Sequence, residues 1–259
     1  MLWQKSWWES RILLWVSLAL VVFLMVLEIS HISHDPSWEE NLLRGAGSWN
    51  EETRQALPSL NSFQGRVWVI WFKVTFKFIL PYLAMCWATL VPGCANPYTG
   101  KSIDEGRIFM LSLPVSRRGI LLTQAATGCG ALWLIAVTSS LLLPIISLWK
   151  GQWYSVKDAL IFASLSILGA LVFYFLTLLM TVIFDNGMKS LLLGVVVYAT
   201  TLYPLRLFES SPRWNINRLI AGEDYFLHGR IPWLASGVCL LISALLLLGA
   251  VRVFERRDF

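Results

Sequence analysis

Charged residues are scarce in this sequence. Only 14% of its 259 residues are charged and 56% are hydrophobic, whereas charged residues make up about 25% of a typical soluble domain. The charges gather in short stretches between long apolar runs, as a chain that alternates between water and hydrocarbon requires. One water-soluble core of this size cannot bury so much apolar surface, so we predict an integral membrane protein.

Disulfide, zinc and redox motifs are also absent. No C-x-x-C pair occurs, and the four cysteines lie in or beside apolar runs, at Cys86, Cys94, Cys129 and Cys239. We interpret them as small apolar packing residues. The net charge of +5 comes without any block of like charge. We therefore expect contact with anionic lipid headgroups and no binding of nucleic acid.

Two short patterns suggest ligand binding, and we interpret both as ordinary loop sequence. Residues 95–102 fit a relaxed phosphate-loop pattern, but a true phosphate loop follows a strand and opens a helix. Here an apolar run precedes the pattern and Pro97 interrupts it, so we predict no nucleotide site in this chain. His31, His34 and Asp35 are spaced to chelate a metal. Two histidines in a loop are more often plain polar residues, and we predict no metal site.

Catalytic groups are missing from the apolar runs. No run carries carboxylates, histidines or serine nucleophiles clustered near its middle, as an intramembrane enzyme would need. We therefore predict no catalytic residues. Asp158 and Asp185 lie at the ends of runs, and we interpret both as solvated.

Six apolar runs are each long enough, at about 1.5 Å per residue, to cross about 30 Å of hydrocarbon as a helix. They cover approximately residues 12–29, 67–91, 124–148, 159–184, 190–207 and 231–251. We therefore predict an all-α fold of six transmembrane helices, which forms one domain over residues 1–259.

Six crossings place both ends of the chain on one side of the membrane. The polar loops 30–66 and 208–230 then share the opposite side, while segment 93–122 lies with the termini. Segment 1–11 carries tryptophans at helical spacing, which predicts a helix lying in the membrane interface before the chain turns inward. The positive-inside rule favours cytoplasmic termini, because arginines flank the spans on that side at Arg117, Arg118, Arg252, Arg256 and Arg257.

Lys73 and Lys77 are the cations within a predicted span. They are four residues apart, so they share one face of the second helix. One interpretation is that both side chains extend to lipid headgroups. The other is an electropositive lining that contacts an anionic substrate or headgroup.

Residues 103–122 form a distinctive polar connection. Asp104 and Glu105 suit a helix N-terminus, where the helix dipole favours negative charge. Pro114 ends that helix, and Ser116 is placed to cap the next one. We therefore predict a short helix that lies across the mouth of the bundle and presents a surface to the cytosol.

This segment resembles the signature of ABC-2 type permeases, the membrane subunits of ATP-binding cassette transporters. In that signature a glutamate leads through Gly-Thr to Leu-Leu-Ser-x-Pro-Val-Ser-Arg, and Arg107 stands here where threonine is common. The tail 252–259 also resembles the family's usual ending. The residues that match the signature are Glu105, Gly106, Leu111, Ser112, Pro114, Val115, Ser116 and Arg117.

The resemblance implies the permease subunit of an exporter in the bacterial cytoplasmic (inner) membrane, with both termini cytoplasmic. Two such chains, identical or related, would pair and recruit two separate ATPase subunits. Those subunits would bind ATP and magnesium, so this chain would bind no cofactor and would not be an enzyme. The segment within 93–122 would be the first coupling helix and 185–190 the second contact. The residues implied in coupling are Glu105, Phe109, Leu113, Pro114, Arg117, Arg118, Asp185 and Lys189.

A membrane anchor is the alternative function. Such a scaffold would hold a cytosolic partner without moving a substrate. It predicts partner binding without any conformational change that depends on ATP.

Overall fold

The computed structural model describes residues 2–32, 60, 62–90, 116–184, 186–202 and 216–256. Of these residues, 91% are helical, so the predicted all-α class is confirmed for them. The main helices are α1 (Leu2–Ile32), α5 (Phe63–Val67), η2 (Trp68–Phe76), α6 (Lys77–Ala88), α8 (Arg117–Trp149), α9 (Val156–Phe184), α10 (Gly187–Leu202), α11 (Ile216–Ala221), α12 (Glu223–His228) and α13 (Trp233–Arg256).

Five helical segments are long and apolar enough to cross a membrane. They are Arg11–Ser30 within α1, Phe63–Ala88 (which joins α5, η2 and α6), Arg117–Trp149, Val156–Phe184 and Trp233–Arg256. Their outward faces keep large hydrophobic side chains exposed, among them Phe23, Leu141, Leu241 and Leu245. These faces suit contact with lipid tails, and the chain has the character of a multi-pass membrane protein.

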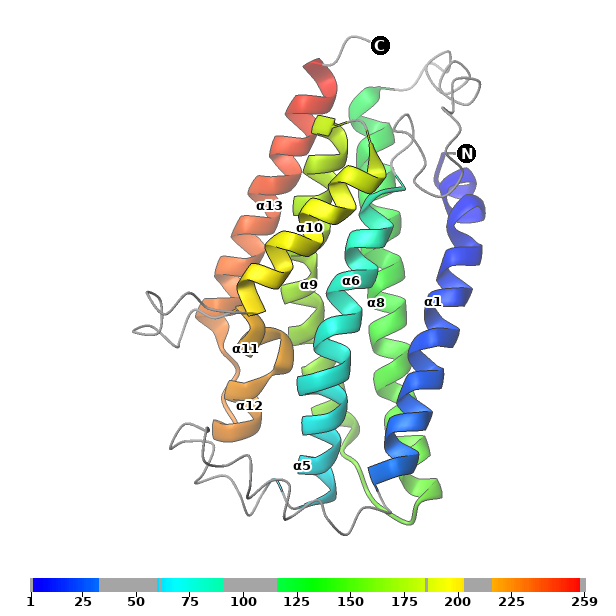
Figure 1. Ribbon diagram of the computed structural model, residues 1–259, viewed down its shortest axis with the longest axis vertical. Helices are drawn as coiled ribbons and strands as arrows, with labels where there is room; N and C mark the ends of the chain where they lie inside the picture. The colour runs from blue at the N-terminus through cyan, green and yellow to red at the C-terminus, as the bar shows by residue number, and fades with distance from the viewer. Residues whose placement is uncertain are drawn as a thin grey trace.

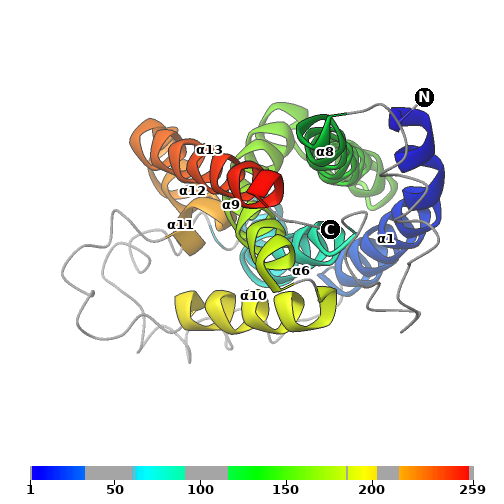
Figure 2. The same cartoon turned by 90° about the horizontal axis from the view of Figure 1, so that it is seen from above.

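Helix α9 is the centre of the bundle. It packs against α6, α8, α10, α11 and α13. Figure 2 shows α8 and α10 on opposite sides of α9, with α1 at the edge of the bundle beside α8. Small residues permit the close approaches, as small residues commonly do between membrane helices. At Gly128 of α8, for example, a Cβ atom would lie 2.2 Å from the Tyr174 hydroxyl of α9.

Helix α1 is longer than the first predicted span. The sequence predicted an interfacial helix over 1–11 and a turn into the membrane, but α1 is continuous from Leu2 to Ile32. No glycine or proline interrupts residues 2–32, so no residue in this stretch favours a helix break. An interfacial position for segment 1–11 stays a prediction.

The described residues of α10 cover part of the fifth predicted span. The helix has 16 residues, which extend about 24 Å at the rise of an α-helix, whereas the run was expected to continue to residue 207. Residues 203–207 lie outside the described residues, so the sixth crossing stays a prediction.

The predicted outer loop 208–230 contains two short helices. Ile220 and Ala221 at the end of α11 are completely buried, and α11 packs against α9. Gly222 then turns the chain into α12 with a left-handed backbone, at φ 63°, a conformation that glycine adopts without steric cost. This part of the predicted loop therefore belongs to the packed bundle.

Different helices and chain termini lie at the two ends of the bundle. Both ends of the described chain, Leu2 and Arg256, lie at one end, together with the first turns of α8 and α10 (Figure 1). We call this the terminal end. Helices α5 and α12 lie at the other end (Figure 1), which we call the opposite end.

Candidate functional site

An ion-pair cluster joins the second membrane segment to α11 and α12. The Lys73 Nζ atom lies 3.3 Å from Glu223 Oε1, and the Arg218 Nε atom lies 3.3 Å from Glu223 Oε2. Arg218 Nη2 also lies 3.2 Å from Asp224 Oδ1. Glu223 and Asp224 occupy the first turn of α12, where the helix dipole favours carboxylates. These two cations and two carboxylates form the ion-pair cluster, and Lys77 also interacts electrostatically with Glu223.

The π-helix η2 positions Lys73 in this cluster. Its nine residues, Trp68–Phe76, form a helix type that is rare and is found frequently at functional sites. Lys73 follows Trp68 by five residues, the hydrogen-bond period of a π-helix, and its Nζ atom lies 5.2 Å from the centre of the Trp68 ring. This distance permits a cation–π interaction.

Trp68 also connects η2 to the short helices. Its Nε1 atom donates a hydrogen bond to the Ala221 carbonyl oxygen over 2.8 Å. Its ring stacks on Phe226 of α12, with 4.1 Å between the ring centres and 1° between the planes. One fully buried side chain therefore holds both α11 and α12 against the second membrane segment.

Both lysines that the sequence grouped interact electrostatically with Glu223. Lys73 pairs with Glu223 while 35% of its side chain stays exposed. Lys77, one helical turn later, is half-buried at the start of α6. Headgroup contact and an electropositive lining both stay predictions for the exposed part of these side chains.

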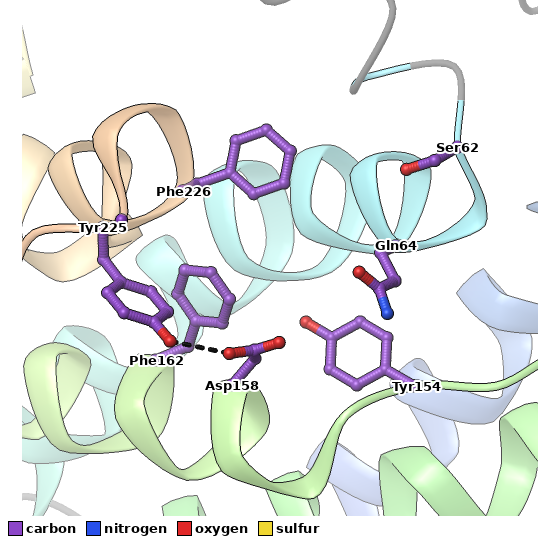
Figure 3. A pocket seen from close by; sticks show the side chains of 8 residues that line it. Ser62, Gln64, Tyr154, Asp158, Phe162, Tyr225 and Phe226 are labelled. Carbon is purple, nitrogen blue, oxygen red and sulfur yellow. Dashed lines mark hydrogen bonds between the residues drawn. The ribbon is translucent and has the colours of Figure 1, made fainter.

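A pocket of about 320 Å³ lies beside α12 at the opposite end. Figure 3 shows the Asp158 carboxylate and the Tyr154, Tyr225, Phe162 and Phe226 rings around it. Four segments supply the wall: the start of α5, the segment before α9, the first turns of α9, and α12 with the residue after it. The lining residues are Ser62, Gln64, Tyr154, Asp158, Phe162, Tyr225, Phe226 and Gly229.

Asp158 and Tyr225 form the polar contact of the pocket. The Tyr225 hydroxyl donates a hydrogen bond of 2.6 Å to Asp158 Oδ1. Burial, this hydrogen bond and the negative charge of Asp158 raise the pKa of Tyr225 to about 12. Tyr225 is therefore a protonated donor at neutral pH. The sequence interpreted Asp158 as solvated, and the structure places its half-buried carboxylate in the pocket wall.

Asp158 gives the pocket a negative charge. It is the only charged residue among the described residues of the lining. The ion pairs found in the described part of the chain do not include it. The ring of Phe162 packs edge-on against Tyr225, with 5.4 Å between the centres. The pocket therefore combines one carboxylate with aromatic walls.

The terminal end contains the described part of the predicted coupling region. The prediction that Ser116 caps α8 is confirmed, since its Oγ atom accepts a hydrogen bond of 3.2 Å from the Gly119 amide. Arg118 pairs with Glu255 near the end of α13, and its Nη2 atom donates a hydrogen bond of 3.0 Å to Glu255 Oε2. Arg117, the neighbouring residue, is half-buried.

The second predicted contact lies at the same end. Lys189 is exposed in the first turn of α10, and the Asn186 side chain caps this turn. Asn186 Oδ1 accepts hydrogen bonds from the Met188 and Lys189 amides, over 3.0 and 3.2 Å. The remaining predicted coupling residues lie outside the described residues, and they are Glu105, Phe109, Leu113, Pro114 and Asp185.

No group of three potential metal ligands occurs among the residues that the structure describes. His34 and Asp35 lie outside them, so the sequence interpretation of that segment stays a prediction. Comparisons with protein-family models, curated proteins and solved structures found no match to this chain.

Proposed function

We propose that this chain is the membrane-spanning permease subunit of an ATP-binding cassette exporter. The sequence support is the resemblance of residues 103–122 to the ABC-2 permease signature. The structural observation that carries the proposal is the placement of the two predicted contact regions. The last residue of the signature, Arg117 at the start of α8, and Lys189 at the start of α10 both lie at the terminal end (Figure 1), where one cytosolic partner could reach them.

The proposal includes six crossings and cytoplasmic termini in a bacterial inner membrane. Five segments have the length and hydropathy of membrane spans. Helix α10 begins at the terminal end, while α12 lies at the opposite end, from which α13 returns (Figure 1). The passage from α10 to α12 would thus be a further crossing, which supports a count of six.

Coupling would begin at the segment before α8. Glu105, Phe109 and Leu113 would contact the ATPase, and Pro114 would end the coupling helix. Arg118 links the first turn of α8 to Glu255 of α13. A displacement of the coupling segment would therefore act on α8 and α13 together, because these helices also pack against each other.

The chemistry of ATP hydrolysis would belong to two partner subunits. Closing of the ATPase pair would move the coupling contacts, and a paired permease chain would complete the transport path. The ligand-dependent change would then be a shift between two arrangements of the helices.

The test is a charge reversal in the coupling segment. Glu105→Lys should abolish ATP-dependent transport and weaken copurification of the ATPase, while leaving membrane insertion intact. Glu51→Lys is the matched control, because it makes the same charge reversal in the predicted outer loop. Purification of the tagged chain in mild detergent, followed by mass spectrometry, identifies the partner and the ratio of chains.

Two results would contradict the proposal. One is the absence of any ATPase subunit from the purified complex, and the other is unchanged transport in the Glu105→Lys variant. A cytosolic partner that binds without any ATP-dependent change would instead support the membrane anchor.

A further inference from the structure

We propose that the pocket around Asp158 binds an organic ammonium ion, with the positive group against the carboxylate and its alkyl substituents against the aromatic rings. This site goes beyond the proposed transport function and does not depend on it. The ligand class follows from charge, wall chemistry and position in the bundle.

The charge of the pocket selects a cation. Asp158 is the only charged side chain in the described lining. Tyr225 donates to Oδ1, which holds the carboxylate in place without neutralising it. Lys73 and Arg218 pair with the carboxylates of α12 and not with Asp158. An anion would therefore approach an uncompensated carboxylate.

The walls select an organic cation over a metal ion. Calcium commonly takes six to eight oxygen ligands, about 2.3–2.6 Å away, and the described part of the lining contains one carboxylate. Four of the eight described lining residues are aromatic, namely Tyr154, Phe162, Tyr225 and Phe226. Aromatic faces attract quaternary ammonium groups through the ring quadrupole. A volume of about 320 Å³ is within the usual range for small-molecule sites, about 300–1,000 Å³.

The aromatic rings are fixed before any ligand arrives. Phe226 is stacked on the buried Trp68 ring, and Trp68 is hydrogen-bonded to Ala221. Tyr225 is held by Asp158 and by the edge-on contact with Phe162. A ligand therefore does not have to order these side chains, which reduces the entropic cost of binding.

The pocket lies at the depth where lipid headgroups are found. Asp158 is in the first turn of α9, at the end of a membrane segment. Trp149 and Trp153 lie just before the pocket residue Tyr154, and 80% and 68% of their respective surfaces are exposed. Exposed tryptophans are characteristic of the membrane interface. The ammonium group could come from a lipid headgroup or from a soluble amine, and the chemistry is the same.

The experiment measures binding of radiolabelled choline to the full chain in nanodiscs of phosphatidylglycerol, a lipid without an ammonium group. Choline should bind saturably. Its neutral isostere 3,3-dimethyl-1-butanol should compete at least about tenfold more weakly, because it has the same shape without the charge. Equal competition by the two compounds would overturn the proposal without the need for any variant.

Two variants localise the site. Asp158→Asn keeps the shape and a hydrogen-bond acceptor for Tyr225 but removes the charge, and it should weaken choline binding by about tenfold or more. Glu255→Gln makes the same chemical change at the terminal end and should leave choline binding unchanged. Choline affinity that is unchanged in Asp158→Asn, or lowered equally in both variants, would contradict the assignment.

The source of the ligand is determined by changing the lipid. Weaker binding of added choline in phosphatidylcholine nanodiscs than in phosphatidylglycerol nanodiscs would show competition by the headgroup, and would support a lipid site. Equal binding in both would support a soluble ammonium ligand. The failure of this site would leave the transport proposal untouched, because the Glu105→Lys test uses a different readout and the terminal end.

Discussion

The contact between α9 and α11 provides a sharp test of the fold. A Cβ atom added to Gly169 of α9 would lie 2.2 Å from Ile220 Cγ1, more than 1 Å inside an ordinary contact. Ile220 cannot move aside easily because it is completely buried. Its carbonyl oxygen also accepts a hydrogen bond of 2.6 Å from Ser166 Oγ. We therefore expect Gly169→Ala to disturb α11.

The magnitudes follow from the distances around Gly169. Overpacking of this kind costs about 1–3 kcal/mol, offset by up to about 1 kcal/mol because alanine favours a helix more than glycine does. Ile220→Ala alone should cost about 2–5 kcal/mol by leaving a cavity. In the double variant the clashing atoms of Ile220 are gone, and the nearest remaining one is Cβ at 3.5 Å. The double variant should then be more stable than the sum of the single changes predicts, by about 1–3 kcal/mol.

The assay is unfolding of the purified chain in mixed micelles by titration with SDS, followed by tryptophan fluorescence. Gly237→Ala is the control, because no atom lies within 4 Å of its added Cβ, and it should leave stability unchanged or raise it slightly. The gain in helix propensity from Gly169→Ala is the same with and without Ile220. It therefore cancels when the double variant is compared with the two single variants. Additive free energies would refute the packing of α11 against the middle of α9.

Two further predictions concern the charges and the orientation. Glu223→Gln should lower the free energy of unfolding by about 1–2 kcal/mol in the same assay, because Lys73 loses its carboxylate partner. The loss stays modest because Lys73 is partly exposed and Arg218 keeps Asp224 as a second partner. Unchanged stability would show that the ion-pair cluster does not stabilise the fold. For orientation, the four native cysteines are replaced by serine and single cysteines are introduced. In intact cells an impermeant maleimide should label Gln152→Cys but not Lys189→Cys. The Lys189→Cys variant should react only after the cells are permeabilised. The reverse pattern would place the termini outside the cell.

Hydropathy predicted the long helices because membrane insertion depends on the composition of one continuous segment. The fourth span was expected over 159–184 and is found at Val156–Phe184. The Ser116 cap was also predictable, since a cap involves the side chain and an amide only three residues apart. Both features are local in the sequence, so a single sequence is sufficient to predict them.

The site depends on contacts that are distant in the sequence. Asp158 and Tyr225 are 67 residues apart, and neither residue indicates the other. Tyr154 precedes Asp158 by four residues, which was the one local indication of a polar site there. The π-helical backbone of η2 has no pattern in the sequence by which we could have predicted it.

The short helix α11 has a hydrophobic pattern in the sequence, but polar residues on both sides make it hard to recognise. Ile216, Leu219 and Ile220 follow the spacing of one helical face, and Leu219 and Ile220 are indeed buried. The run is too short to cross a membrane, and polar residues flank it on both sides. A search for membrane spans therefore assigns the whole region to a loop.

The position of Lys73 gives a physical reason why this region folds back against the bundle. Lys73 is the eleventh residue of the segment Phe63–Ala88, so its backbone lies up to about 15 Å along the helix from the opposite end. An unpaired lysine within the hydrocarbon is costly, by up to about 2.5–3.5 kcal/mol at the middle of the bilayer on the insertion scale. Glu223 can relieve that cost only if α12 approaches η2 closely, and the stacking of Trp68 on Phe226 stabilises the same approach. The ion pair and the aromatic stack thus draw a polar segment of the chain into contact with a membrane helix, and this contact forms one wall of the pocket.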